Sequence, residues 1–349
     1  MRDELAAAGV AAEIEPFPGY SSFAWPFGAI LLAALAPAAL PRRWRRARGA
    51  LATLAAATLA TEGGLVHTPL SRLLSRRTSQ NVVATIEPRG EALRTLCLCC
   101  HLDTSRSGLM FQPGVVEHLN AIISAQSAAV LVQGGEAILA RSRPGRGLLT
   151  VARAMVAAGL ALLIEREIRG VDVPGASDNA SGSAIAAQLA AEKGADPPAA
   201  TRIVLLMTGG EEAGTLGAQA FLESRDTSGW LFLNFDNLGG PATLRFLRRE
   251  GVLAKWDADA GLVAVAEGLR ARRPDLALEP TDSPAGLTYD SSPVMARGGR
   301  ALTLSAQDRT IPNLHMPTDT YENVDPDVIG RALDAGRAMI AAIDRGEAD

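Results

Sequence analysis

Apolar residues recur along this chain with the spacings of buried strands and of the helices that cover them. Short apolar runs bounded by turn residues predict strands at residues 81–86, 94–100, 202–207 and 230–235, and an opening strand near residues 12–16. Apolar residues at helical spacing predict helices at residues 181–193, 215–224, 260–272 and 326–345. Because strands and helices alternate, we expect an α/β fold with a mostly parallel, mixed central sheet sandwiched between helices.

A different pattern, of long apolar stretches, interrupts this alternation near the N-terminus. Residues 22–40 are nineteen residues without a charge, and residues 49–66 contain one, Glu62. A helix of about twenty apolar residues can cross a bilayer core of roughly 30 Å. The connection between them, residues 41–48, holds five arginines, which favour an anionic, cytoplasmic surface. The pair predicts a membrane hairpin.

A second, less apolar pair follows in residues 114–140 and 147–164, joined by a basic turn at residues 141–146. Because a charge inside a bilayer must be paired, Arg153 is expected to meet Glu117 or Glu136 if this hairpin also spans. The alternative for both hairpins is a set of buried helices that covers a soluble domain or forms an interface between subunits.

Composition narrows the class of protein. Across 349 residues, 48% are hydrophobic and mean hydropathy is +0.12, which excludes a disordered chain. A net charge of −4 and 4% aromatic residues argue against nucleic acid as a partner. Cys97, Cys99 and Cys100 crowd into one predicted strand, where disulfide geometry cannot be met, so we expect buried core thiols.

Five short polar motifs fall where this topology places functional loops, just after apolar runs. They supply two histidines and several carboxylates, a ligand set that suits zinc or a similar divalent metal. The motifs are His101-Leu102-Asp103, residues 176–182 around Asp178, residues 209–214 around Glu211-Glu212, residues 234–239 around Asp236, and residues 313–319 around His315.

Two of these motifs have a physical rationale of their own. Residues 101 and 103 of a strand end lie on the same side, so the Asp103 carboxylate could accept a hydrogen bond from the ring of His101 and orient it. Glu211 and Glu212 would repel each other after a buried strand unless a cation lies beside them. Since adjacent side chains diverge, one carboxylate can bind a metal while the other acts as a general base. Alone, Asp178 could be a helix cap and His315 a surface histidine.

The combined set resembles the M28 metallopeptidases, which are co-catalytic dizinc aminopeptidases, and their glutaminyl cyclase relatives, over residues 78–106 and 170–330. The resemblance implies a zinc-exopeptidase-like fold, a peptide substrate and two Zn²⁺ ions. It implies that His101 and Asp236 bind one ion, that Glu212 and His315 bind the other, and that Asp178 bridges them. It further implies that Asp103 orients His101, that Glu211 is the general base, and that a cis peptide joins Asp178 and Asn179. The stretch containing Tyr289 and Asp290 would line the substrate pocket, and Asp319 matches an acidic position after the ligating histidine.

The chain departs from this pattern in length. Asp103 and Asp178 are 75 residues apart, whereas the family usually separates them by about a dozen. We therefore expect one discontinuous catalytic domain, residues 1–21, 68–106 and 170–349, with two inserted helical hairpins at residues 22–67 and 107–169. Without the hairpins, about 240 residues of ordinary α/β composition remain. An insertion so close to the active site could also cover it and restrict the substrates.

These observations predict a membrane-attached, zinc-dependent aminopeptidase that contacts the bilayer through residues 22–66 and also through residues 114–164 if the second hairpin spans. Eight arginines in the two hairpin turns favour an extracytoplasmic active site, although other arginines flank the opposite helix ends. The alternatives are a glutaminyl cyclase-like acyltransferase, a metal-bound membrane scaffold without catalysis, and a soluble oligomer whose hairpins form the interface.

Overall fold

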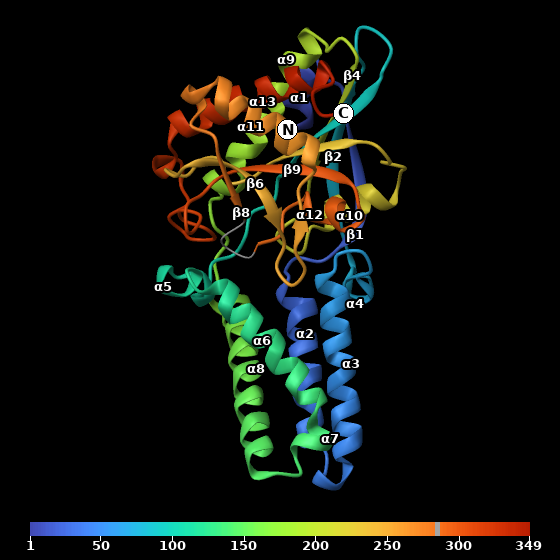
Figure 1. The fold of residues 1–349 in the computed structure, drawn as a ribbon, viewed down its shortest axis with the longest axis vertical. Coiled ribbons are helices and arrows are strands. Elements are labelled where there is room, and N and C mark those ends of the chain that lie inside the picture. Colours follow the sequence, from blue (N-terminus) through green and yellow to red (C-terminus); the bar gives the residue numbers. More distant parts are fainter. Residues whose placement is uncertain (283–286) are drawn as a thin grey trace.

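The computed structural model describes residues 1–282 and 287–349, which form an α/β part and a helical bundle that projects from it (Figure 1). The strands of the α/β part that the structure describes make one sheet. Its order is β1 (Ala12–Gly19), β2 (Arg77–Ile86), β4 (Thr201–Thr208), β3 (Arg94–His101), β5 (Leu231–Phe235), β9 (Arg300–Ala306), β6 (Leu244–Glu250) and β7 (Trp256–Asp257), with β8 (Glu279–Asp282) paired to β6.

The centre of the sheet is parallel and its edges are antiparallel. β4, β3, β5 and β9 run parallel to one another, whereas β1 pairs antiparallel with β2, β2 with β4, and β6 with β9. The expected mixed α/β fold is thus confirmed, and the five expected strands are present as β1 to β5. The apolar pattern does not predict β6, because Arg245, Arg248, Arg249 and Glu250 interrupt its apolar residues.

Helices cover both faces of the sheet. α9 (Gly182–Ala195), α11 (Ala260–Arg272) and α13 (Pro326–Asp344) pack on one face with the short α1 (Arg2–Ala7), while α10 (Leu216–Glu223) and α12 (Ser292–Ala296) pack on the other. Alternate residues of a strand face opposite sides, so Cys100 joins the first core and Cys97 and Cys99 join the second. All three cysteines are buried free thiols, as expected, and burial raises their pKa values.

The bundle consists of helices from the two apolar regions (Figure 1). They are α2 (Ala24–Leu35), α3 (Arg45–Gly63), α6 (Leu119–Gly134) and α8 (Arg143–Arg169), with α4 (Pro69–Leu74), α5 (Pro113–Val116) and α7 (Glu136–Leu139) at the ends. α2 and α6 each pack against both α3 and α8, so the two pairs form one unit. Ile30, Val130 and Val156 are fully buried in its core.

Both basic turns lie at the end of the bundle far from the sheet (Figure 1). There the guanidinium group of Arg153 lies 2.7 Å from the Glu136 carboxylate, which confirms one of the two pairings expected from the sequence. Glu136 also contacts Arg48 of α3 at 2.9 Å. A single acidic residue therefore joins the first hairpin to the second.

Helix lengths differ from the expectation for the first hairpin. α2 covers twelve residues and continues as a 3₁₀ helix over Ala36–Ala39, where Pro37 lies. Among the residues that the structure describes, the one helix long and apolar enough to cross a membrane, judged by length and composition, is α8 with 27 residues. That helix belongs to the second hairpin, which is the less apolar pair in sequence.

Candidate metal centre

The polar motifs converge at the carboxyl edge of the parallel strands. His101 is the last residue of β3, Glu211 and Glu212 follow β4 after two glycines, and Asp236 follows β5. The chain leaves central β3 for β4 on one side and reaches β5 on the other, so the strand order reverses here. Such a switch point is where ligands bind in open α/β sheets.

Two groups of possible metal ligands meet at one shared carboxylate. His101, Asp178 and Asp236 form the first group, and Asp178, Glu212 and His315 form the second, with the ligand atoms of each group within 4.8 Å of one another. The Asp178 Oδ1 atom lies 3.2 Å from His101 Nε2, and its Oδ2 atom lies 3.2 Å from His315 Nε2. The structure thus brings together all five residues that the sequence suggested as ligands.

Asp178 lies in an irregular turn between the bundle and α9, followed by a cis peptide bond to Asn179. The Asp319 carboxylate holds this turn by accepting hydrogen bonds from the main-chain N–H groups of Ser177 and Asp178, at 2.8 and 3.0 Å. The Asn179 side chain donates to the Phe235 carbonyl oxygen at 2.9 Å and so ties the turn to β5. These contacts fix the shared carboxylate between the two histidines.

The expected hydrogen bond between the His101 ring and the Asp103 carboxylate is wrong. His101 Nδ1 lies 2.9 Å from the main-chain carbonyl oxygen of Asp103 and 3.9 Å from its carboxylate. That carboxylate instead accepts the main-chain N–H groups of Glu211 and Glu212, both at 3.1 Å. Two donors that converge from one turn satisfy both carboxylate oxygens, which a single ring N–H cannot do.

The charges of the site favour a cation. Burial lowers the pKa of His315, but the carboxylates of Glu212 and Asp178 outweigh it and raise this pKa to about 9. Burial raises the pKa of Asp236 to about 7, and the negative charge of Asp178 adds to this rise. Burial also raises the pKa of Glu211 well above its usual range. Crowded, buried carboxylates of this kind are stabilised by nearby positive charge.

The donor set fits zinc in chemistry as well as in charge. Glu212 Oε1 is a buried atom without a hydrogen-bond partner in the part of the chain that the structure describes, and His315 turns its Nε2 atom toward the carboxylates of Asp178 and Glu212. Imidazole nitrogens and carboxylate oxygens are common zinc ligands. Glu211 belongs to neither ligand group, although it lies beside Glu212 on the wall of the same cavity. Its carboxylate is therefore available for proton transfer.

The two residues expected to line the pocket differ in position. Tyr289 lines the cavity beside the site, whereas Asp290 is fully buried and its carboxylate accepts a hydrogen bond from the Thr208 hydroxyl at the end of β4. Asp290 therefore does not line the cavity that a ligand would enter. Its negative charge contributes to the raised pKa of Glu211.

Phe111 is a site residue that the sequence pattern does not reveal. It lies in the segment leading from β3 to the bundle, and its ring packs edge-on against His315 with the ring centroids 4.2 Å apart. No spacing rule connects residue 111 with residue 315, since the contact depends on how the second hairpin leaves the sheet. The segment leading into the bundle therefore shapes the site directly.

The α/β fold and its candidate metal centre can now be compared with those of known proteins. The family model described as peptidase family M28 matches residues 163–340, which is half of the chain. The chain belongs to this family, and the resemblance seen in the motifs is confirmed. A comparison with curated proteins gives no match.

Solved structures with the same fold include aminopeptidases and cyclases. BSAP, a zinc aminopeptidase from Bacillus subtilis, is 15% identical over 77% of this chain and 51% of its own, with a TM-score of 0.50. This chain thus spans about half the length of that enzyme. Glutaminyl cyclase from Tannerella forsythia is 13% identical over 97% of this chain and 87% of its own, with a TM-score of 0.53. Glutaminyl cyclase from Porphyromonas gingivalis is 12% identical over 97% of this chain and 86% of its own, with a TM-score of 0.51.

Proposed function

We propose that this protein is a membrane-attached, zinc-dependent exopeptidase of the aminopeptidase type. The observation that carries the proposal is the pair of ligand groups that share Asp178, with Glu211 left outside both groups. In this proposal His101 and Asp236 would hold one zinc ion, Glu212 and His315 would hold the other, and the Asp178 carboxylate would serve both groups. Zinc bound there would lower the pKa of a coordinated water and polarise the scissile carbonyl group.

The remaining roles belong to side chains of the chain itself. Glu211 accepts the proton of the attacking water and returns it to the leaving amine. Asp103 holds the main chain of the Glu211-Glu212 turn, and Asp319 holds the turn that carries Asp178. Tyr289 and the apolar walls of the cavity limit the access of bulk water to the scissile bond.

Replacing the proposed base tests this function. Glu211→Gln removes the proton acceptor with little change in shape, so kcat should fall by about 10²–10⁴-fold while zinc content stays the same. The assay is hydrolysis of a panel of aminoacyl para-nitroanilides by the detergent-purified, zinc-loaded protein. Glu91→Gln, at an exposed position of the α/β part, is the matched control and should leave kcat unchanged. Activity that survives Glu211→Gln would contradict the assignment.

Glutaminyl cyclase activity is the second candidate, because the cyclase structures share this fold over nearly the whole chain. Cyclisation expels ammonia from an N-terminal glutaminyl peptide, whereas hydrolysis releases the first amino acid. Incubation with such a peptide and analysis of products by mass spectrometry separates the two reactions. A metal-bound scaffold without catalysis would give neither product and would tolerate Glu211→Gln.

We also propose that the helices of residues 22–67 and 107–169 attach the protein to a lipid bilayer as inserted hairpins. Large apolar side chains are exposed on the bundle, including Leu32 at 58%, Leu54 at 64% and Leu131 at 64%. Soluble surfaces seldom expose so many large apolar side chains on one bundle. The length and composition of α8 also support attachment to a membrane. The basic turns at the far end of the bundle favour the cytoplasmic side for that end, which would leave the active site outside the cytoplasm.

Cysteine labelling tests this topology. The native cysteines are buried, so an introduced cysteine is the reactive one when a membrane-impermeant maleimide is added to intact cells. Glu91→Cys in the α/β part should be labelled, and Ala47→Cys near the tip of the bundle should be protected until the membrane is opened. Equal labelling of both positions in intact cells would contradict the proposed span.

A further inference from the structure

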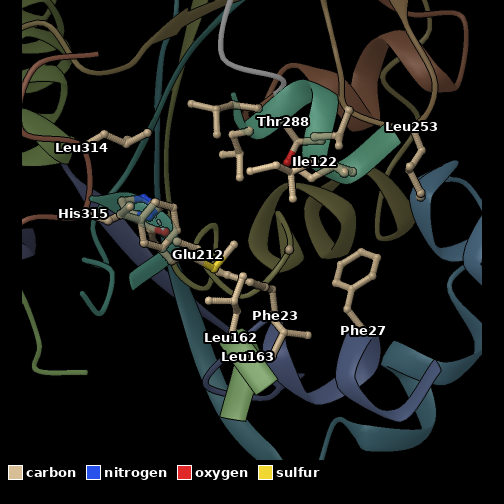
Figure 2. Close-up of a pocket in the computed structure, with 18 of the residues that line it drawn as sticks. Phe23, Phe27, Ile122, Leu162, Leu163, Glu212, Leu253, Thr288, Leu314 and His315 are labelled. Carbon is tan, nitrogen blue, oxygen red and sulfur yellow. Dashed lines mark ion pairs between the residues drawn. The ribbon is translucent and has the colours of Figure 1, made fainter. Parts of the chain in front are cut away.

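The candidate metal centre opens into an apolar cavity of about 270 Å³ that the bundle helps to build (Figure 2). His315 and Glu212 lie at one side of this space, and Phe27 and Leu253 lie at the other side. The bundle walls come from four helices, through residues such as Phe27 of α2, Leu59 of α3, Ile122 of α6 and Leu162 of α8. Helices from both hairpins therefore enclose the approach to the site.

The cavity walls carry charged side chains at the metal centre and mostly apolar side chains beyond it. Among the described lining residues, the carboxylates are Asp178, Glu211, Glu212 and Asp236 of the centre itself, and no lysine or arginine lines the cavity. Most lining residues that the bundle helices contribute have apolar side chains. The exceptions are the polar residues Gln126 and Ser127, and the glycines Gly63 and Gly159, which have no side chain. The cavity beyond the metal centre thus has few groups that could bind the peptide units or charges of a ligand.

This contrast favours one kind of occupant. An extended peptide would bring an N–H and a C=O group per residue against walls with few partners, and each unmet group disfavours binding. An aliphatic chain has no such groups, and each methylene that it buries favours binding by about fourfold. The carboxylates of the candidate metal centre lie at one end of the cavity, and the reacting amide would be placed beside them.

We propose that the substrate carries a long aliphatic chain directly beside the scissile amide, and that this chain lies in the cavity between α2, α3, α6 and α8. This inference rests on the proposed hydrolytic function and adds its substrate class. In the reaction the amide C–N bond breaks, the hydroxyl of water joins the carbonyl carbon, and the proton passes through Glu211 to the amine. The chain can come from a fatty acyl group or from the side chain of an N-terminal residue.

Two substrate series with the same chromophore distinguish these sources. One contains para-nitroanilides of alanine, 2-aminohexanoic acid and 2-aminodecanoic acid, and the other contains acetyl, hexanoyl and decanoyl para-nitroanilides. With zinc-loaded full-length protein, kcat/KM should rise about fourfold per added methylene in the series that matches the natural substrate, until the cavity is full. Flat kcat/KM across both series would overturn the proposal.

Variants with a larger side chain locate the chain in the cavity. Leu162→Trp and Ile122→Trp fill the cavity from two different helices and should lower kcat/KM for the longest substrate at least tenfold more than for the shortest substrate. Ile164→Trp and Leu131→Trp, at exposed positions 48% and 64% accessible on the same two helices, are the matched controls and should not alter the chain-length preference. Equal losses for short and long substrates in both cavity variants, at unchanged thermal stability, would contradict the proposed location.

A binding measurement separates failure of this inference from failure of the proposed function. A dansyl-labelled undecanoic acid should bind wild-type protein and Glu211→Gln with the same affinity, and cavity variants at least tenfold more weakly. Binding of this kind without hydrolysis of any substrate would refute the hydrolytic function and support the chain-binding cavity. Equal binding by wild type and both cavity variants would refute the proposal that the aliphatic chain binds in this cavity.

Discussion

Two aspartates hold the candidate centre through the main chain and not through the ligands themselves. The Asp103 carboxylate accepts the N–H groups of Glu211 and Glu212, and the Asp319 carboxylate accepts those of Ser177 and Asp178. Each contact fixes a turn from which a functional carboxylate extends. The positions of Glu211, the proposed base, and of the Asp178 carboxylate therefore depend on partners that lie outside the candidate ligand set.

Asp103→Asn tests this holding role. An asparagine keeps one acceptor oxygen but turns an amide NH₂ toward one of the two N–H donors, so the Glu211-Glu212 turn should shift. Loss of such an orienting partner typically lowers activity or metal affinity by 10–100-fold, and we expect a loss of this size in kcat with a smaller change in KM. Steady-state kinetics at saturating zinc provide the measurement.

The control for this prediction is Asp196→Asn, whose side chain is 76% exposed and distant from the site in the fold. It should retain wild-type kcat. An Asp103→Asn enzyme with unchanged kcat would show that the two N–H contacts do not position the base.

One buried carboxylate connects the two helical hairpins. Glu136 contacts Arg48 of α3 at 2.9 Å and Arg153 of α8 at 2.7 Å, and the side chains of Glu136 and Arg48 are each only 6% exposed. The helices also pack through apolar residues such as Val130 and Val156. Because the arginines come from different hairpins, this contact fixes how the hairpins associate.

Glu136→Gln should destabilise the bundle. Removing one partner leaves the buried Arg48 guanidinium without its counter-charge, a change that typically lowers the free energy of unfolding by about 3–5 kcal/mol. Chemical denaturation in detergent, followed by circular dichroism, provides the measurement. Glu117→Gln, at an exposed position between α5 and α6 and away from this contact, is the matched control, and an equal effect of the two substitutions would contradict the role of the buried contact.

The sequence predicts elements well where one physical signal dominates. The buried strands β3 and β4 are continuous apolar runs, and His101 at the end of β3 follows directly from that reading. Helix α2 is shorter than its apolar stretch, since the chain changes to a 3₁₀ helix where Pro37 lies. Hydropathy is the same for both kinds of helix and therefore could not predict this boundary. The partner of Asp103 could not be predicted either, since local spacing brings residue 101 near it but only the fold brings residues 211 and 212.

The helical bundle and the sheet meet at the candidate metal centre. Phe111 packs on His315, and bundle side chains line the cavity that begins at the candidate metal ligands. These candidate ligands all come from outside residues 107–169, although Asp178 follows that segment closely. The bundle thus has two proposed tasks, attachment to a bilayer and selection of the substrate.

Extraction from membranes distinguishes attachment from the soluble-oligomer alternative. Because exposed apolar side chains such as Leu54 and Ile168 would face lipid, high salt and alkaline carbonate should leave the protein in the membrane pellet, and detergent should release it. Fractionation followed by immunoblotting gives the answer. Release by salt alone would instead support a soluble oligomer whose hairpins form the interface.

We propose that two zinc ions share Asp178, and the zinc stoichiometry of the purified protein tests this proposal. Mass spectrometry of purified, zinc-loaded protein should give two ions per wild-type chain, and Asp178→Asn should give fewer than two with the fold retained by circular dichroism. One ion or fewer per wild-type chain, or two ions retained by Asp178→Asn, would contradict the shared-carboxylate centre.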